Sequence, residues 1–104
     1  SMKDYKKAEE EYLKAAAIDN QNLDTIYGEL YELERFFLKD PARTEAILIE
    51  GVSTYPKETN ILAQLAFYYR DIGQTQKAID RYEELLGKYP ESIVAKQALA
   101  ELRK

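Results

Sequence analysis

The residues of this chain whose type and spacing could support chemistry are its clustered carboxylates. Glu29 and Glu32 lie three positions apart, and Glu9, Glu10 and Glu11 are consecutive. Carboxylates one helical turn apart can perform general acid–base catalysis or bind Ca²⁺, provided that a pocket shifts the pKa of one of them. Nothing in the sequence predicts such a pocket, and carboxylates on an acidic helix are usually solvated. We therefore expect that the chain is not an enzyme.

Histidine and cysteine are absent from the sequence. Their absence excludes thiolate nucleophiles, Ser-His-Asp triads, disulfides and the usual ligands of zinc or haem. We accordingly expect no metal and no cofactor.

The charge balance bears on possible partners. Lys and Arg number 15 against 19 Asp and Glu, which gives a formal net charge of −4, and no basic block exceeds two residues. Proteins that bind nucleic acid through its phosphates carry a basic stripe, so we expect no nucleic acid partner. The longest charge-poor stretch, ILAQLAFYY at 61–69, is shorter than the roughly 20 residues of a membrane-spanning helix, so we expect no membrane insertion.

Segment 59–92 has the pattern of two antiparallel helices. Apolar residues recur at spacings of three and four in each half, as on one face of an amphipathic helix. The first set is Ile61, Leu62, Leu65, Tyr68, Tyr69 and Ile72, and the second is Ala78, Ile79, Tyr82, Leu85 and Leu86. Gly73 can take the left-handed conformation that ends the first helix. Tyr89-Pro90 ends the second, because the residue before proline avoids the helical region.

A looser copy of this hairpin precedes it. Pro56 lies 34 positions before Pro90. Residues of the first set have counterparts 35 positions earlier, namely Ile26, Tyr27, Leu30, Leu33 and Phe37. Asp40-Pro41 predicts the start of a second helix, because Asp caps helices and proline suits the first helical position. The change of offset from 35 to 34 predicts one extra residue in the turn at 38–43.

Partial copies flank the two hairpins. Ala8, Tyr12 and Ala15 have the small-large-small spacing of a second helix within 4–22, and Ser92 can cap a final helix over 93–104. The chain is thus expected to be all-α, with six helices. Repeats of this length indicate stacked hairpins, in which each neighbour covers the apolar face of the last.

These repeats resemble the tetratricopeptide repeat family. The residues that carry the resemblance are Leu62, Leu65, Ala66, Tyr69, Gly73, Ala78, Tyr82, Leu85 and Pro90. Leu62 and Leu85 depart from the family pattern, and the middle repeat departs further, with Tyr31 at a small-residue position and Glu34 where Tyr is expected.

The resemblance implies a right-handed α-solenoid of antiparallel helical hairpins, as a single domain over 4–104. Its parts would be a truncated repeat (4–22), a degenerate repeat (24–58), a clear repeat (59–92) and a capping helix (93–104). We expect residues 1–2 to be a remnant of expression, so the N-terminus does not indicate localisation. Residues 89–98 also resemble repeat ends of bacterial cell-envelope members, which leaves the cytoplasm and the cell envelope both open.

In this family the first helices of successive repeats line a concave groove that holds a peptide. The resemblance therefore implies a non-catalytic protein–protein interaction module, expected here within a larger protein. The groove positions carried over from the family are Arg35, Phe36, Asn60, Gln64, Phe67 and Arg70, with Val94, Gln97 and Glu101 from the final helix.

Phe67 and the two arginines admit two interpretations each. Phe67 lies off the apolar face of its helix, so it is either a peptide-binding hot spot or packs against Phe36. Arg35 and Arg70, 35 positions apart, either bind carboxylates of an acidic peptide or pair with Glu32 and Asp71 on the surface.

A structural role is the alternative function. The helix within 4–22 has no preceding partner helix, so Ala8, Tyr12 and Ala15 would form an exposed apolar strip. The sequence then predicts that the chain forms a homodimer through this strip or that the helix frays, with no ligand in the groove.

Overall fold

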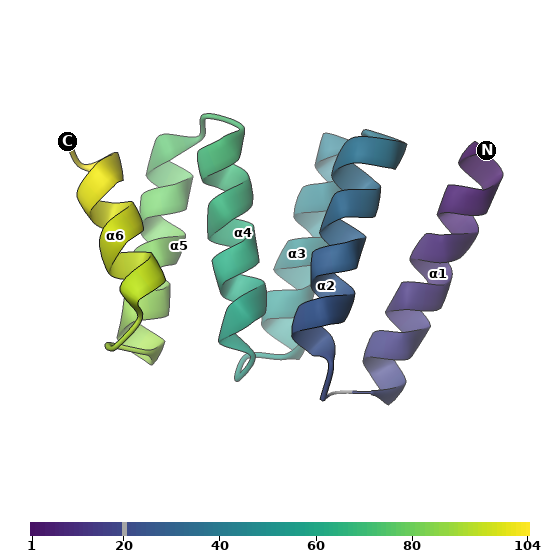
Figure 1. Ribbon diagram of the computed structural model, residues 1–104, viewed down its shortest axis with the longest axis horizontal. Coiled ribbons are helices and arrows are strands. Elements are labelled where there is room, and N and C mark those ends of the chain that lie inside the picture. The colour runs from purple at the N-terminus through teal and green to yellow at the C-terminus, as the bar shows by residue number, and fades with distance from the viewer. Residues whose placement is uncertain (20) are drawn as a thin grey trace. The chain divides into compact units, whose positions relative to one another are not determined.

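The computed structural model describes residues 1–19 and 21–104, and its elements are helical throughout these ranges (Figure 1). In chain order they are α1 (Met2–Ile18), α2 (Leu23–Glu32), η1 (Leu33–Leu38), α3 (Pro41–Thr54), α4 (Thr59–Asp71), α5 (Thr75–Lys88) and α6 (Ile93–Leu102). Because η1 is a π-helical continuation of α2, the expectation of six helices and an all-α class is confirmed. The chain forms two compact units, Ser1–Ile61 and Leu62–Lys104, and each is described by itself.

In the first unit, α1 and α3 both pack against α2 and η1. Figure 1 shows α1 alongside α2. The buried apolar residues are Ala16, Leu23, Ile26, Tyr27, Leu30, Tyr31, Leu33, Ile47, Leu48 and Ile61. Gly51 of α3 lies so close to α2 that a Cβ at this position would stand 2.6 Å from Cε1 of Tyr27. The absence of a side chain at Gly51 is therefore what allows α3 to pack on the Tyr27 ring.

The second unit contains α5, α6 and all of α4 except its first residues. Its buried apolar residues are Leu62, Leu65, Ala66, Tyr68, Tyr69, Ala78, Tyr82, Leu85, Ala95, Ala98 and Leu99. Tyr82 is 1% exposed, so the aromatic side chain predicted on the inner face of α5 lies at its core.

The predicted helix ends are confirmed. Asp40 accepts a hydrogen bond from the backbone N–H of Arg43 (3.0 Å) at the start of α3, with Pro41 in the first turn. Ser92 likewise accepts from Ala95 (3.2 Å) at the start of α6. Gly73, two residues after the end of α4, has a φ of 82°, and α5 ends at Lys88, before Tyr89-Pro90.

The extra residue of the middle repeat lies inside a helix, so its predicted place in the turn at 38–43 is wrong. Among the described residues, φ is positive at Lys39 (54°) and Gly73 (82°), which lie 34 positions apart. Pro41 and Thr75, which begin α3 and α5, are also 34 positions apart, so the two turns have equal length. The residue is absorbed by η1, because a π-helical turn holds more residues than an α-helical one.

Two residues predicted on the inner faces are half-exposed instead. Phe37 is 52% exposed and Ile72 is 42% exposed. Ile72 lies after the end of α4, where the helical periodicity no longer applies. Phe37 lies in η1, where the π-helical geometry rotates side chains away from the positions that an α-helix would give them. Within the described ranges, no helix combines the length and the apolar character needed to cross a membrane.

Candidate functional site

Gln64, Phe67 and Arg70 follow one another at intervals of three residues on α4, so they share one side of this helix. Phe67 is 44% exposed, whereas its neighbours Ala66 and Tyr68 are buried. A large apolar ring thus lies at the surface of α4 although the core of the same helix is filled.

Arg70 connects α4 to the two other helices of its unit. Its guanidinium donates a hydrogen bond to Oε2 of Glu101 on α6, at 2.6 Å. Burial raises the pKa of Tyr82 on α5, and Arg70 beside the hydroxyl partly offsets this effect. Glu101, itself a predicted groove position, is therefore an acidic partner of Arg70 within the same chain.

Arg35 and Phe36 belong to η1 in the first unit. Arg35 donates a hydrogen bond to the Tyr31 hydroxyl (2.5 Å), and its guanidinium lies 5.2 Å from the centre of the Phe36 ring. Phe36 is 54% exposed and meets the Tyr31 ring edge-on. Arg35 and Phe36 of η1 thus form one aromatic and cationic cluster with the buried Tyr31 of α2.

Asn60 lies at the start of α4, where its Nδ2 donates to the carboxylate of Glu58 (3.0 Å). The predicted groove residues thus divide between the two units, with Arg35, Phe36 and Asn60 in the first and the remainder in the second. A single groove that joins the two sets stays a prediction.

The predicted self-association strip on α1 is partly covered by its own unit. Ala8, Tyr12 and Ala15 are each of intermediate burial. A hydrogen bond to the carboxylate of Glu29 on α2 raises the pKa of the Tyr12 hydroxyl, which shows that Tyr12 faces α2. Homodimer formation through this strip stays a prediction.

Glu34 is the most deeply buried acidic side chain in the described residues, a role that was not predicted from the sequence. It is 1% exposed, and neither carboxyl oxygen accepts a hydrogen bond. Its counterpart in the clear repeat, 35 positions later, is the buried Tyr69. An acidic residue at a position where the repeat pattern requires a buried tyrosine was the available signal.

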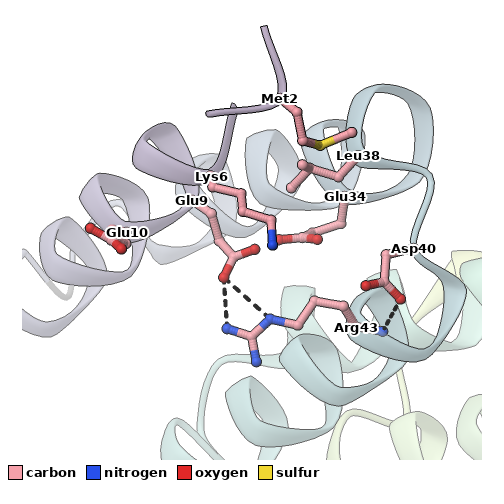
Figure 2. A pocket seen from close by; sticks show the side chains of 8 residues that line it. All are labelled: Met2, Lys6, Glu9, Glu10, Glu34, Leu38, Asp40 and Arg43. Carbon is pink, nitrogen blue, oxygen red and sulfur yellow. Dashed lines mark hydrogen bonds and ion pairs between the residues drawn. The ribbon is translucent and has the colours of Figure 1, made fainter. Parts of the chain in front are cut away.

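Glu34 lines a pocket of about 570 Å³ between α1, η1 and the start of α3. The other lining residues are Met2, Lys6, Glu9, Glu10, Leu38, Asp40 and Arg43. Figure 2 shows the side chains of Lys6, Glu9, Glu34 and Arg43 converging on one space. The expectation that no pocket shifts the pKa of a carboxylate is therefore wrong at this place.

The charges in this pocket are coupled. Arg43 donates from Nε and from a terminal nitrogen to Oε1 of Glu9, at 3.2 and 2.6 Å. Burial, with the neighbouring Glu9 adding to it, raises the pKa of Glu34 to about 8. Burial also opposes ionisation of Glu9, but hydrogen bonds to Glu34 and Arg43 outweigh it and lower the pKa of that carboxyl. At neutral pH Glu34 therefore keeps its proton beside an ionised Glu9.

The pocket lacks the side chains of a metal centre. Among residues 1–19 and 21–104, no three His, Cys, Asp or Glu side chains are grouped so that they could hold a metal ion. The arrangement offers carboxyl oxygens and a bound guanidinium instead.

Comparison with known families gives a match for the segment from α4 to α6. Residues 59–102 match the family model of the tetratricopeptide repeat, so the resemblance is confirmed and this segment is a tetratricopeptide repeat. The match begins with α4 and ends with α6. The comparison with curated proteins gives no match. Tetratricopeptide repeats generally mediate protein–protein interactions and are typically non-catalytic.

Proposed function

We propose that this chain is a non-catalytic module that binds a segment of a partner protein, and that the contact centres on Phe67 of α4. The observation that carries the proposal is that Phe67 is 44% exposed although its neighbours on α4 are buried. This helix lies in the segment that matches the tetratricopeptide repeat, a family that generally mediates protein interactions. Gln64 and Arg70 lie on the same side of α4 and can hydrogen-bond to a bound backbone or side chain.

The energetics favour an apolar anchor over an arginine clamp. Covering the exposed part of a phenylalanine contributes about 1 kcal/mol, since burial of the whole side chain contributes about 1.5–3 kcal/mol. Arg70 already pairs with Glu101, so a partner carboxylate would exchange one exposed ion pair for another. Arg70 therefore orients a ligand more than it strengthens its binding.

The test is capture of partners from a lysate of the source cell with three forms of the chain. These are the native form, Phe67→Ala, and Ile18→Ala as a matched control at another exposed apolar residue, 84% exposed on α1. We expect one set of proteins to be lost with Phe67→Ala alone, at unchanged helicity by circular dichroism.

The same proteins captured by all three forms would overturn the proposal. In that case the strip formed by Ala8, Tyr12 and Ala15 becomes the surface to test, by measuring the mass of the chain against its concentration.

A further inference from the structure

We propose that the pocket between α1, η1 and α3 binds an organic cation with several N–H donors, an ammonium or guanidinium group, held between Glu34 and Glu9. This site lies in the first unit and goes beyond the proposed contact at Phe67.

The carboxyl oxygens of the buried Glu34 receive no hydrogen bond from an N–H donor of the chain. Buried polar side chains almost always have hydrogen-bond partners, because burial without one costs free energy. Glu34 is 1% exposed, and neither of its carboxyl oxygens accepts a hydrogen bond, since its one hydrogen bond is through its own proton to Glu9. The π-helical segment η1 nevertheless places this side chain in the pocket wall. A ligand that brings N–H donors to these oxygens supplies the missing bonds.

Glu9 offers a second carboxylate to the same ligand, because Arg43 binds only one of its oxygens and a cation can replace the Glu34 proton that also hydrogen-bonds to it. Both donors of Arg43 bind Oε1 of Glu9, so Oε2 accepts from neither of them. Figure 2 shows Glu9 from α1 and Glu34 from η1 directed to the same space. Two carboxyl groups from different elements can thus share the donors of one ligand. The side chains of Met2 and Leu38 in the same lining suit the methylene stem that carries such a group.

Acidic side chains outnumber basic ones in the lining of the pocket. Four acidic side chains line the pocket, Glu9 and Glu10 from α1, Glu34 from η1 and Asp40 at the start of α3, against two basic ones, Lys6 and Arg43. The excess of carboxyl groups attracts cations and opposes anions. A bare metal ion does not fit, because the described residues contain no group of three metal-ligating side chains and Arg43 occupies one oxygen of Glu9.

Binding of a cation is linked to the proton on Glu34. The ligand requires the ionised carboxylate, so its charge replaces the proton that burial retains. Lys6, Glu9, Glu10, Asp40 and Arg43 are the other titratable groups that line this pocket, and Glu9, Asp40 and Arg43 act electrostatically on Glu34. Affinity is therefore expected to increase as the pH rises from 6 to 8.5, because the cation competes with the Glu34 proton and that proton is bound less strongly at higher pH.

The experiment follows backbone amides of the ¹⁵N-labelled chain during titration with four probes. These are N-acetyl-lysine methylamide, N-acetyl-arginine methylamide, n-butylammonium, and N-acetyl-norleucine methylamide as the neutral control. We expect saturable shifts in residues 2–10 and 33–43 with at least one cationic probe, and none with the norleucine compound. Binding of n-butylammonium as tight as that of the amino-acid probes would identify a free amine as sufficient. Binding of the amino-acid probes alone would identify a basic side chain of a protein partner.

Two variants and the pH test the assignment. Glu34→Gln retains the shape of the side chain and removes its charge, and it is expected to weaken binding about tenfold or more. Glu91→Gln, at an exposed position before α6, is the matched control and should bind as the native chain does. The proposal is overturned by non-saturable shifts at concentrations on the order of 10 mM, by equal binding to Glu34→Gln, or by native-chain affinity that does not change with pH.

Discussion

Arg43 binds the carboxylate of Glu9 through two N–H groups, across 34 positions of sequence, and so connects the start of α3 to α1. The Glu9 side chain is 14% exposed and lies beside the neutral Glu34, so it depends on this guanidinium for its charge balance. Arg43 accordingly contributes to holding α1 against the remainder of its unit.

Replacement of Arg43 by Gln is expected to destabilise the chain by about 1–3 kcal/mol, because it leaves a partly buried carboxylate without its cation. Urea denaturation followed by circular dichroism measures the change. Arg81→Gln is the matched control, since Arg81 pairs with Glu84 one helical turn away on α5 at 3.0 Å. This pair is expected to contribute less than about 1 kcal/mol. Equal effects of the two substitutions would contradict the role given to Arg43.

Glu34→Gln is expected to stabilise the chain, and increasingly so as the pH rises. The folded chain keeps the Glu34 proton up to about pH 8, whereas an unfolded chain releases it near the ordinary value of 4.5. Between about pH 4.5 and 8, Glu34 ionises only in the unfolded state, so the native chain loses stability as the pH rises through this range. The variant has no carboxyl group at this position and does not lose stability in this way. The difference at pH 8 is expected to be roughly 2–4 kcal/mol. Urea denaturation at pH 5, 6.5 and 8 measures it, and a constant difference would contradict the prediction.

Gly51→Ala is expected to destabilise the first unit by about 1–3 kcal/mol, since overpacking strains a filled core. The new Cβ would lie 2.6 Å from Cε1 and 2.9 Å from Cζ of Tyr27, whose ring is buried and packs edge-on against Tyr55. Gly87→Ala in α5 is the control, because a Cβ there meets nothing within 4 Å. This control is expected to gain about 0.5–1 kcal/mol from helix propensity. Thermal melts should therefore move in opposite directions, and a shift in the same direction would count against the close approach of α3 and α2.

The two left-handed residues give a further pair of expected changes. Lys39→Gly is expected to stabilise the chain by roughly 0.5 kcal/mol, because a lysine side chain is strained at a φ of 54°. Gly73→Ala is expected to destabilise it by about 1 kcal/mol, because φ is 82° there. Both changes are measured by denaturant unfolding. Destabilisation by Lys39→Gly would show that the Lys39 side chain makes a contact that outweighs its backbone strain.

The helix ends and the buried helix faces were predictable from the sequence, because both depend on residues that are close together in the chain. The ends of the helices depend on residues within a few positions of each other, so Asp40-Pro41, Gly73, Ser92 and Tyr89-Pro90 predicted them correctly. The buried faces of α4 and α5 follow from helical periodicity, as Leu65 and Tyr82 illustrate. The all-α class, the number of helices and the tetratricopeptide repeat at 59–102 follow from the same local patterns, because the repeat is itself a local unit.

Contacts between distant positions decided the remainder. The offset between repeats showed that the middle repeat has one extra residue. The sequence alone does not distinguish a longer turn from a π-helical segment as the place of that residue. In the folded unit it lies in η1, which packs against α1 and α3. Arg70 and Glu101, 31 positions apart, meet only in the folded unit. In the sequence, Glu34 is marked only as an acidic residue at a position where the repeat pattern expects Tyr. It becomes a neutral carboxyl in a charged pocket because folding removes it from water and places Glu9 and Arg43 beside it, and desolvation by tertiary packing has no counterpart in the local sequence.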